Sequence, residues 1–298
     1  MTRAKANLIL LITAAIWGMG FIAQSDAMEH IGPFFFIGLR FAVATLVMLP
    51  WAMREAKTAA KPLNAYEWKA FAGIGFTLFL GMLSQQAGLL TTSVTNSGFL
   101  TGLYLIIVPF LGVVLFRQWP HWVVWPAASG ALFGIFLLSG GALDQLKTGD
   151  WYTIVCALFW ALQILFITRY AASSGRPVTQ AVTQFAVTAV LGMILALTFE
   201  KLDWYAALLA SNEILFAGVF AGGIAFTMQS IGQRYTTAAQ AAIFLSSEAL
   251  FAAFFDALFN STRLGVMAIA GCVLIFGAML AVELVPMWLK RGQLTPEI

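Results

Sequence analysis

The stretch LILLITAAIWGMGFIA, residues Leu8–Ala23, decides the fold class of this chain. It carries no charge, and a helix of about 20 such residues spans the ~30 Å hydrocarbon core of a bilayer. Arg3 and Lys5 precede it, as basic residues precede the apolar part of a secretory signal peptide. Because the apolar stretch is long and many others follow, we interpret it as a retained first membrane span.

Nine further apolar stretches follow with little sequence between them. Of the 298 residues, 61% are hydrophobic and 10% are charged, and the mean hydropathy is +0.88. A soluble domain carries about 25% charged residues, so the composition excludes a water-soluble globule. Pro109 predicts a kink within one of the spans. The predicted transmembrane helices are 7–25, 33–53, 68–90, 95–116, 122–140, 151–170, 178–199, 213–233, 239–258 and 265–285.

The basic residues of the loops predict how these spans are oriented. With the N-terminus in the cytoplasm, twelve Lys and Arg residues fall on the cytoplasmic side, and Lys147, Lys201 and Arg263 fall on the other. Basic residues are enriched in cytoplasmic loops, so this division predicts an even number of spans with both termini in the cytoplasm. The net charge of +3 is too small to indicate nucleic acid as a partner.

A weak internal repeat divides the chain into two halves. Residues 14–17 (AAIW) resemble residues 157–160 (ALFW), 143 positions later, and two further pairs of blocks are 144 and 145 positions apart. Residues 1–145 and 146–298 are therefore predicted to be two five-helix repeats. Because five is odd, the second repeat enters the membrane from the opposite side. The predicted fold is an all-α polytopic membrane protein with ten transmembrane helices in two inverted repeats, which is typical of secondary transporters.

Four segments resemble the drug/metabolite transporter superfamily, in its EamA-domain exporter branch. They are AAIWG at 14–18, GLRF at 38–41, TSVTNSGFL at 92–100 and FLSSEALFA at 244–252. Ala249 stands where the family often has proline, and Gln118 and Asn260 stand where it often has glutamate. The resemblance implies export of amino acids or other small metabolites across a bacterial inner membrane. It also implies a central cavity lined mainly by the first, third, fourth, sixth, eighth and ninth spans.

Two tryptophans occupy equivalent places in the two repeats. Trp17 and Trp160 both fall in the middle of a span, and Trp17 shares one helical face with Gly20 and Gln24. An indole offers one N–H donor and a broad apolar face, which suits an amphipathic ligand. We therefore expect both tryptophans to line the cavity, and packing between helices is the alternative for both.

Polar side chains in other spans complete the predicted lining. Thr101 and Tyr104 share a helical face, and Asn96 lies near the outer entrance of the same span. Gln85 either lines the pocket or joins two helices by hydrogen bonds. The predicted substrate-binding residues, with no catalytic and no metal-binding residue among them, are Trp17, Gln85, Asn96, Thr101, Tyr104, Trp160, Gln163, Ser246, Ser247 and Glu248.

Arg40 and Glu248 are the charged residues predicted to lie deepest in the membrane. Arg40 is expected to be a structural charge, either a hub of hydrogen bonds or a long side chain that reaches the outer interface. Glu248 is expected to be protonated, paired with a base such as Arg40, or wetted by the cavity. A carboxylate in a cavity holds the amine of an amino acid, or carries a proton in exchange.

The predicted function is a secondary transporter that exports small metabolites, with neutral or aromatic amino acids and related amphipathic compounds as the expected substrates. The chain contains no GxxxxGK[ST], HExxH or GxSxG motif, so neither an enzyme nor a cofactor is expected. An integral-membrane enzyme and a non-transporting scaffold or sensor are the alternatives. The expected partners are a small-molecule substrate and the lipid bilayer. The oligomeric state is open, and a monomer is compatible with the sequence.

Overall fold

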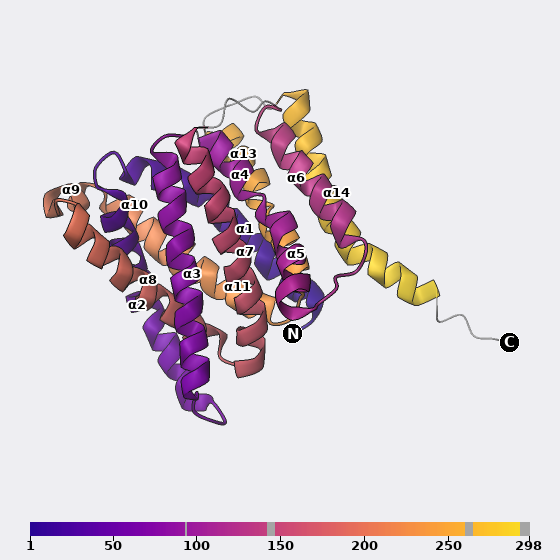
Figure 1. The fold of residues 1–298 in the computed structure, drawn as a ribbon, viewed down its shortest axis with the longest axis horizontal. Coiled ribbons are helices and arrows are strands. Elements are labelled where there is room, and N and C mark those ends of the chain that lie inside the picture. The colour runs from indigo at the N-terminus through magenta and orange to yellow at the C-terminus, as the bar shows by residue number, and fades with distance from the viewer. Residues whose placement is uncertain (93, 142–146, 260–264, 293–298) are drawn as a thin grey trace.

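The computed structural model describes residues 1–92, 94–141, 147–259 and 265–292, which form a bundle of helices (Figure 1). The first half contains α1 (Arg3–Ala27), α2 (Pro33–Thr58), α3 (Ala65–Leu89), α4 (Val94–Thr101), α5 (Tyr104–Phe116) and α6 (Val124–Leu138). The second half contains α7 (Thr148–Ser174), α8 (Pro177–Phe199), α9 (Trp204–Leu209), α10 (Ser211–Leu215), the π-helix η1 (Phe216–Ile224), α11 (Ala225–Gln233), α12 (Ala238–Leu245), α13 (Glu248–Phe259) and α14 (Val266–Gly292).

The described part of the chain contains eight helical segments that are long and apolar enough to cross a membrane, and α6 is a shorter apolar helix. Large apolar side chains such as Leu46, Phe76 and Leu197 point outward and are at least half exposed. In a bilayer this surface faces lipid, where a helix satisfies its own backbone hydrogen bonds. The chain is therefore an all-helical, multi-pass membrane protein. Since α1 is not among the eight segments, the number of ten spans stays a prediction.

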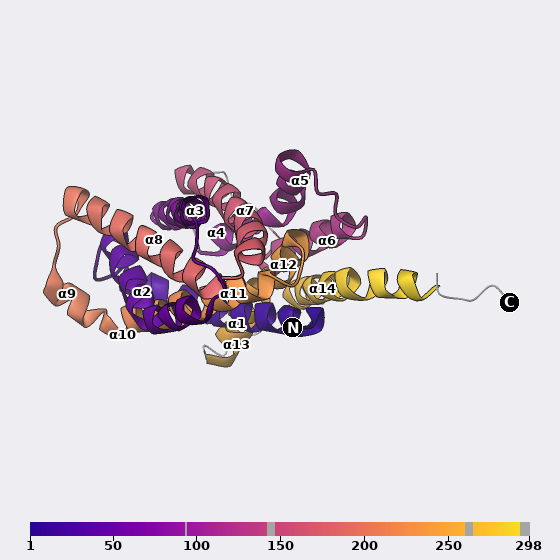
Figure 2. The ribbon, with the colours of Figure 1, turned by 90° about the horizontal axis from the view of Figure 1, so that it is seen from below.

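Helices from the two halves pair with each other in a reciprocal way. α2 packs along α8, and α6 packs along α14, at opposite sides of the bundle (Figure 1, Figure 2). Between these pairs, α1 packs against η1 and α11, while its counterpart α7 packs against α3. Each half thus buries its apolar faces on the other half, and the interior between them positions the site described below.

Two glutamates hold the α2–α8 pair at its ends. The carboxylate of Glu200, just after α8, accepts hydrogen bonds from the first-turn N–H groups of Phe34 (2.9 Å) and Phe35 (2.8 Å) in α2. At the other end, the carboxylate of Glu55 in α2 accepts from the N–H groups of Val178 (3.1 Å) and Thr179 (2.7 Å) in α8. A negative charge at a helix N-terminus satisfies free N–H groups and the helix dipole. The reciprocal caps require the two helices to run antiparallel, as equivalent helices of an inverted repeat do.

The predicted span 95–116 is interrupted, but the break differs from the predicted one. We expected a kink at Pro109, whereas α4 ends at Thr101 and α5 begins at Tyr104. The N–H of Leu103 donates to the carbonyl of Leu100 (3.2 Å) in a tighter turn at this point. Pro109 lies inside α5. Pro109 has no N–H to donate to the carbonyl of Leu105, one turn upstream in α5, so the kink expected there stays a prediction.

Candidate functional site: a central cavity

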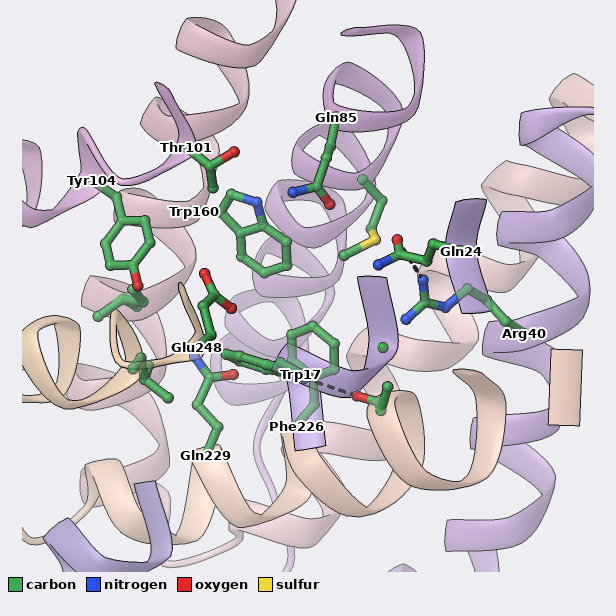
Figure 3. A pocket seen from close by; sticks show the side chains of 15 residues that line it. Trp17, Gln24, Arg40, Gln85, Thr101, Tyr104, Trp160, Phe226, Gln229 and Glu248 are labelled. Carbon is green, nitrogen blue, oxygen red and sulfur yellow. Dashed lines mark hydrogen bonds between the residues drawn. The ribbon is translucent and has the colours of Figure 1, made fainter. Parts of the chain in front are cut away.

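A cavity lies between the two halves of the bundle (Figure 3). Its empty space measures about 550 Å³, which includes space that is open to the outside. Side chains from seven of the predicted spans reach it. Its lining consists of Trp17, Gly20, Gln24, Arg40, Met82, Gln85, Thr101, Tyr104, Trp160, Ile164, Ala221, Phe226, Gln229, Leu245 and Glu248.

The lining is nearly symmetric between the two halves. Trp17 and Trp160 are 143 positions apart, and five more pairs of lining residues are each 144 positions apart: Gly20 with Ile164, Met82 with Phe226, Gln85 with Gln229, Thr101 with Leu245, and Tyr104 with Glu248. Substrate sites of transporters built from inverted repeats lie at such an interface. The two halves match in the positions of the lining residues but not in their charge, because the residue equivalent to Glu248 is Tyr104, a neutral phenol.

Tyr104 and Glu248 reach the cavity because each begins the second part of a broken helix. α12 ends at Leu245 and α13 begins at Glu248, at the positions equivalent to the break between α4 and α5. In the second break, the hydroxyls of Ser246 and Ser247 donate to the carbonyls of Ile243 (2.8 Å) and Phe244 (2.6 Å). Serine side chains that bond the preceding backbone compete with the helical ladder. Broken helices of this kind expose backbone and side chains at the binding site of many transporters.

An aromatic cluster forms the apolar wall of the cavity. The ring of Phe226 is stacked on that of Trp160, with centroids 5.8 Å apart and planes inclined by 10°, and it lies 4.7 Å from the ring of Trp17. The indole N–H of Trp17 donates to the carbonyl of Ala221 in η1 (2.9 Å). Both tryptophans therefore pack between helices and line the cavity at once, so the two alternatives for them coexist.

The π-helix η1 carries this carbonyl to the cavity. Its sequence, FAGVFAGGI, contains three glycines, and a Cβ atom added to Gly218 would lie 2.7 Å from the Cβ atom of Val43 in α2. Small residues let two backbones approach this closely. A π-helical segment also widens the helix and shifts the face that the following residues present. Phe226 and Gln229, in α11 directly after η1, line the cavity.

Gln85 and Gln229 supply amides to the lining, but only one of them is free. Gln229 and Gln163 donate to each other, with Nε2 to Oε1 distances of 3.1 and 3.3 Å, and Gln163 also donates to Gln184 (3.3 Å). Gln163 thus lies behind Gln229 and away from the cavity. Among the residues that the structure describes, Gln85 has no hydrogen-bond partner. Its amide is available to a ligand, as a pocket role requires.

The two charged groups of the lining do not pair with each other. Figure 3 shows Arg40 beside Gln24 on one side of the cavity and Glu248 on the other. The Nη1 atom of Arg40 donates to Oε1 of Gln24 (3.0 Å), and no oxygen of Glu248 lies within 4.0 Å of it. In the described part of the chain, Glu248 has no hydrogen bond to another side chain or to the backbone. Of the three states expected for Glu248, pairing with Arg40 is not observed.

The predicted site residues divide into three groups in the structure. Those around the cavity are Trp17, Gln85, Thr101, Tyr104, Trp160 and Glu248, with Arg40 beside them. Gln163, Ser246 and Ser247 differ from expectation: they are at most 1% exposed and bond to glutamines or to their own helix. The side chain of Asn96 lies outside the described residues. No group of three or more His, Cys, Asp or Glu side chains that could hold a metal ion occurs within the described ranges.

Several lining residues are not among the predicted site residues. Gly20 and Gln24 share a helical face with Trp17, so helical spacing predicts that they follow it into the cavity. Phe226 and Gln229 lie in α11, at the positions equivalent to Met82 and Gln85 of α3. An internal offset of 144 from Met82 and Gln85 is the signal that identifies both.

Comparisons with known proteins agree on one family. The EamA-like transporter family matches residues 4–140 and again residues 147–284. An uncharacterized transporter of Archaeoglobus fulgidus is 28% identical over 282 residues, which cover 95% of this chain and 87% of the relative. An uncharacterized transporter of Synechocystis is 25% identical over 161 residues, 54% of this chain and 48% of the relative.

A solved structure shares the fold as well. It is titled only as the crystal structure of a protein, has a TM-score of 0.81 and 17% sequence identity, and covers 97% of this chain and 99% of its own. At this identity the likeness extends to the fold alone. The two family matches, one in each half and separated by residues 141–146, include all the lining residues of the cavity. This chain belongs to the EamA-like transporter family, and it is a membrane transporter by family.

Proposed function

We propose that the protein is a secondary transporter that exports neutral or aromatic amino acids, or related amphipathic compounds, through the central cavity. The observation that carries the proposal is the lining itself. Trp17, Trp160 and Phe226 form one apolar wall, and Gln85, Tyr104 and Glu248 offer polar groups that have no partner among the described residues. Such a lining matches a small molecule that has an apolar side chain and a polar head.

Alternating access is the mechanism that we propose for this cavity. Each half of the protein contributes one residue to every lining pair. Two pairs, Thr101 with Leu245 and Tyr104 with Glu248, flank the helix breaks, where one part of a broken helix can tilt without moving the other part. Rocking of one repeat against the other around a fixed site exposes that site to each side in turn. Glu248 is the group that we propose to hold the substrate amine or to carry a proton in the opposite direction.

We also propose that the protein resides in a bacterial inner membrane with ten spans and both termini in the cytoplasm. The twelve-to-three division of Lys and Arg supports this orientation. Exposed aromatic residues support the placement of these helices across a membrane. Trp51 and Trp68 lie near the ends of α2 and α3 on one side, and Trp151 and Trp204 lie near the starts of α7 and α9 on the other. Aromatic side chains of this kind gather at the two membrane interfaces.

Uptake into proteoliposomes tests the proposal. The purified full-length protein is reconstituted, and the liposomes are loaded with one unlabelled amino acid and exposed to labelled phenylalanine, leucine, glutamate, lysine and a sugar phosphate. We expect exchange of phenylalanine and leucine well above protein-free liposomes. Exchange of the sugar phosphate alone would contradict the proposed substrate class. If none of these compounds accumulates while the protein remains folded, the proposed transport function is wrong.

A further inference from the structure

Among the residues that the structure describes, Arg40 is a buried cation without an anionic partner. Arg40 is 2% exposed. In the described part of the chain, Nη1 is the one guanidinium nitrogen with a hydrogen bond, which it donates to the neutral amide of Gln24 (3.0 Å). Nε is buried without any partner. The expected hub of structural hydrogen bonds is therefore absent. A buried charge is costly in a membrane protein unless it is paired, so an intramembrane charge of this kind indicates a functional site.

The surroundings of Arg40 hold the guanidinium in place but do not neutralise it. Its Cζ atom lies 5.4 Å from the ring centroid of Phe36 and 5.1 Å from that of Phe41. These cation–π contacts stabilise the positive charge without removing it. Among the described residues, the one ion pair joins Arg3 and Glu283, and no acidic side chain lies within 4.0 Å of Arg40. The free side of the guanidinium lies at the cavity, whose lining includes Arg40.

The internal symmetry shows that Arg40 is not required by packing alone. The equivalent position in the second half is Gln184, which is fully buried and accepts a hydrogen bond from Gln163. A neutral amide in α8 therefore packs at the position that the guanidinium occupies in α2. The positive charge exists in one half only and faces the shared cavity, so it sets the chemistry of that end of the cavity.

We propose that Arg40 is the carboxylate-binding group of the cavity, so that the transported compounds must carry a carboxylate. The inference rests on the proposed transport function and names one end of its substrate. A guanidinium offers paired N–H donors that match the two oxygens of a carboxylate. Binding a carboxylate also supplies the missing counter-charge in a site of low dielectric, where the gain is large. The substrate's apolar part then lies along Trp17 and Phe226, toward Glu248.

Three related compounds test how much the carboxylate contributes to binding, apart from the amine and the ring. Phenylalanine has both charged groups, phenylalaninamide lacks the carboxylate, and 3-phenylpropionate lacks the amine. Binding to the purified protein is followed by quenching of tryptophan fluorescence, and uptake is followed in proteoliposomes. For the wild type we expect phenylalanine and 3-phenylpropionate to bind more tightly than phenylalaninamide. Arg40→Gln should weaken the two carboxylates by about tenfold or more and leave phenylalaninamide unchanged.

Two further variants keep the test decisive. Gln24→Glu places a carboxylate within hydrogen-bond distance of the intact guanidinium, so it should also abolish the preference for carboxylates, even if Arg40→Gln fails to fold. Arg176→Gln is the matched control: Arg176 is also buried (6% exposed) and donates to the carbonyl of Lys61 (3.0 Å), but it does not line the cavity. We expect Arg176→Gln to retain the wild-type preference.

The outcomes distinguish this inference from the proposed function. Equal binding of phenylalanine and phenylalaninamide by the wild type would overturn the role of Arg40, while the transporter proposal would stand. A carboxylate preference that depends on Arg40, without any uptake, would leave the role of Arg40 intact and overturn transport. Absence of binding for all three compounds would overturn both.

Discussion

Glu248 is the residue whose chemistry most directly affects transport. It begins α13, lines the cavity opposite Arg40, and has no partner for its carboxylate among the described residues. A free carboxylate surrounded by Trp17, Trp160 and Phe226 has little water to solvate it, so its charge depends on the ligand or on a proton.

Glu248→Gln therefore tests the role of this charge, since it keeps the shape and the hydrogen-bonding capacity of the side chain. We expect the rate of phenylalanine uptake to fall about tenfold or more and its dependence on pH to flatten. Uptake rates in proteoliposomes over a series of pH values check this. The control is Glu29→Gln, because Glu29 is exposed in the loop before α2. An unchanged rate and pH profile in Glu248→Gln would mean that the carboxylate is structural.

At the scale of the element, the α2–α8 pair is stabilised at both ends by the same device. Glu55 and Glu200 each cap the other helix, and Pro33 and Pro177 begin those helices at equivalent positions. Proline suits the first turn of a helix because its missing N–H needs no partner there. The pair is thus a fixed frame next to the cavity, whereas α4–α5 and α12–α13 are broken.

Removal of these caps should destabilise the protein without changing the cavity. Glu55→Ala and Glu200→Ala are each expected to lower the free energy of unfolding by about 0.5–2 kcal/mol. The two caps lie at opposite ends of a helix pair about 35 Å long, so their effects should add in the double variant. Thermal unfolding in detergent measures the effect, with ligand binding to the purified protein as the check on the cavity. A strongly non-additive double variant would show that the two ends are coupled.

The glycines of η1 provide a second test at this scale. A Cβ atom on Gly218 would lie 2.8 Å from the carbonyl oxygen of Arg40 and 2.7 Å from Val43, so Gly218→Ala must separate η1 from α2. We expect a loss of about 1–3 kcal/mol in unfolding free energy. Gly73→Ala in α3 is the matched control, because no atom lies within 4 Å of the added Cβ atom. It should be neutral or stabilising by up to about 1 kcal/mol. Equal thermal stability of the two variants would refute the close approach.

At the scale of the whole molecule, the orientation in the membrane is the property to test. The positive-inside rule predicts that the C-terminus lies in the cytoplasm. An alkaline phosphatase reporter, which is active only outside the cytoplasm, should give no signal when fused after α14 and a strong signal when inserted in the loop that contains Lys201. The reverse pattern would contradict the predicted orientation, and signal at both sites would contradict the ten-span arrangement.

The sequence by itself determined that the chain is an all-helical membrane protein made of two related halves. Ten apolar stretches with 10% charged residues leave lipid as the solvent, and in lipid a helix is the element that satisfies its own backbone. The offset of about 144 residues also relates Trp17 to Trp160. Both conclusions depend on local composition and spacing, which a sequence contains in full.

The tertiary structure alone decided which polar groups face the cavity. Gln163 was expected in the lining, but it is fully buried and pairs with Gln229. Arg40 was expected to be structural, yet its guanidinium lies at the cavity with one neutral partner. Each outcome depends on which side chain on a distant helix is within about 3 Å. That distance is fixed by the packing of all the helices together and not by spacing along any one of them.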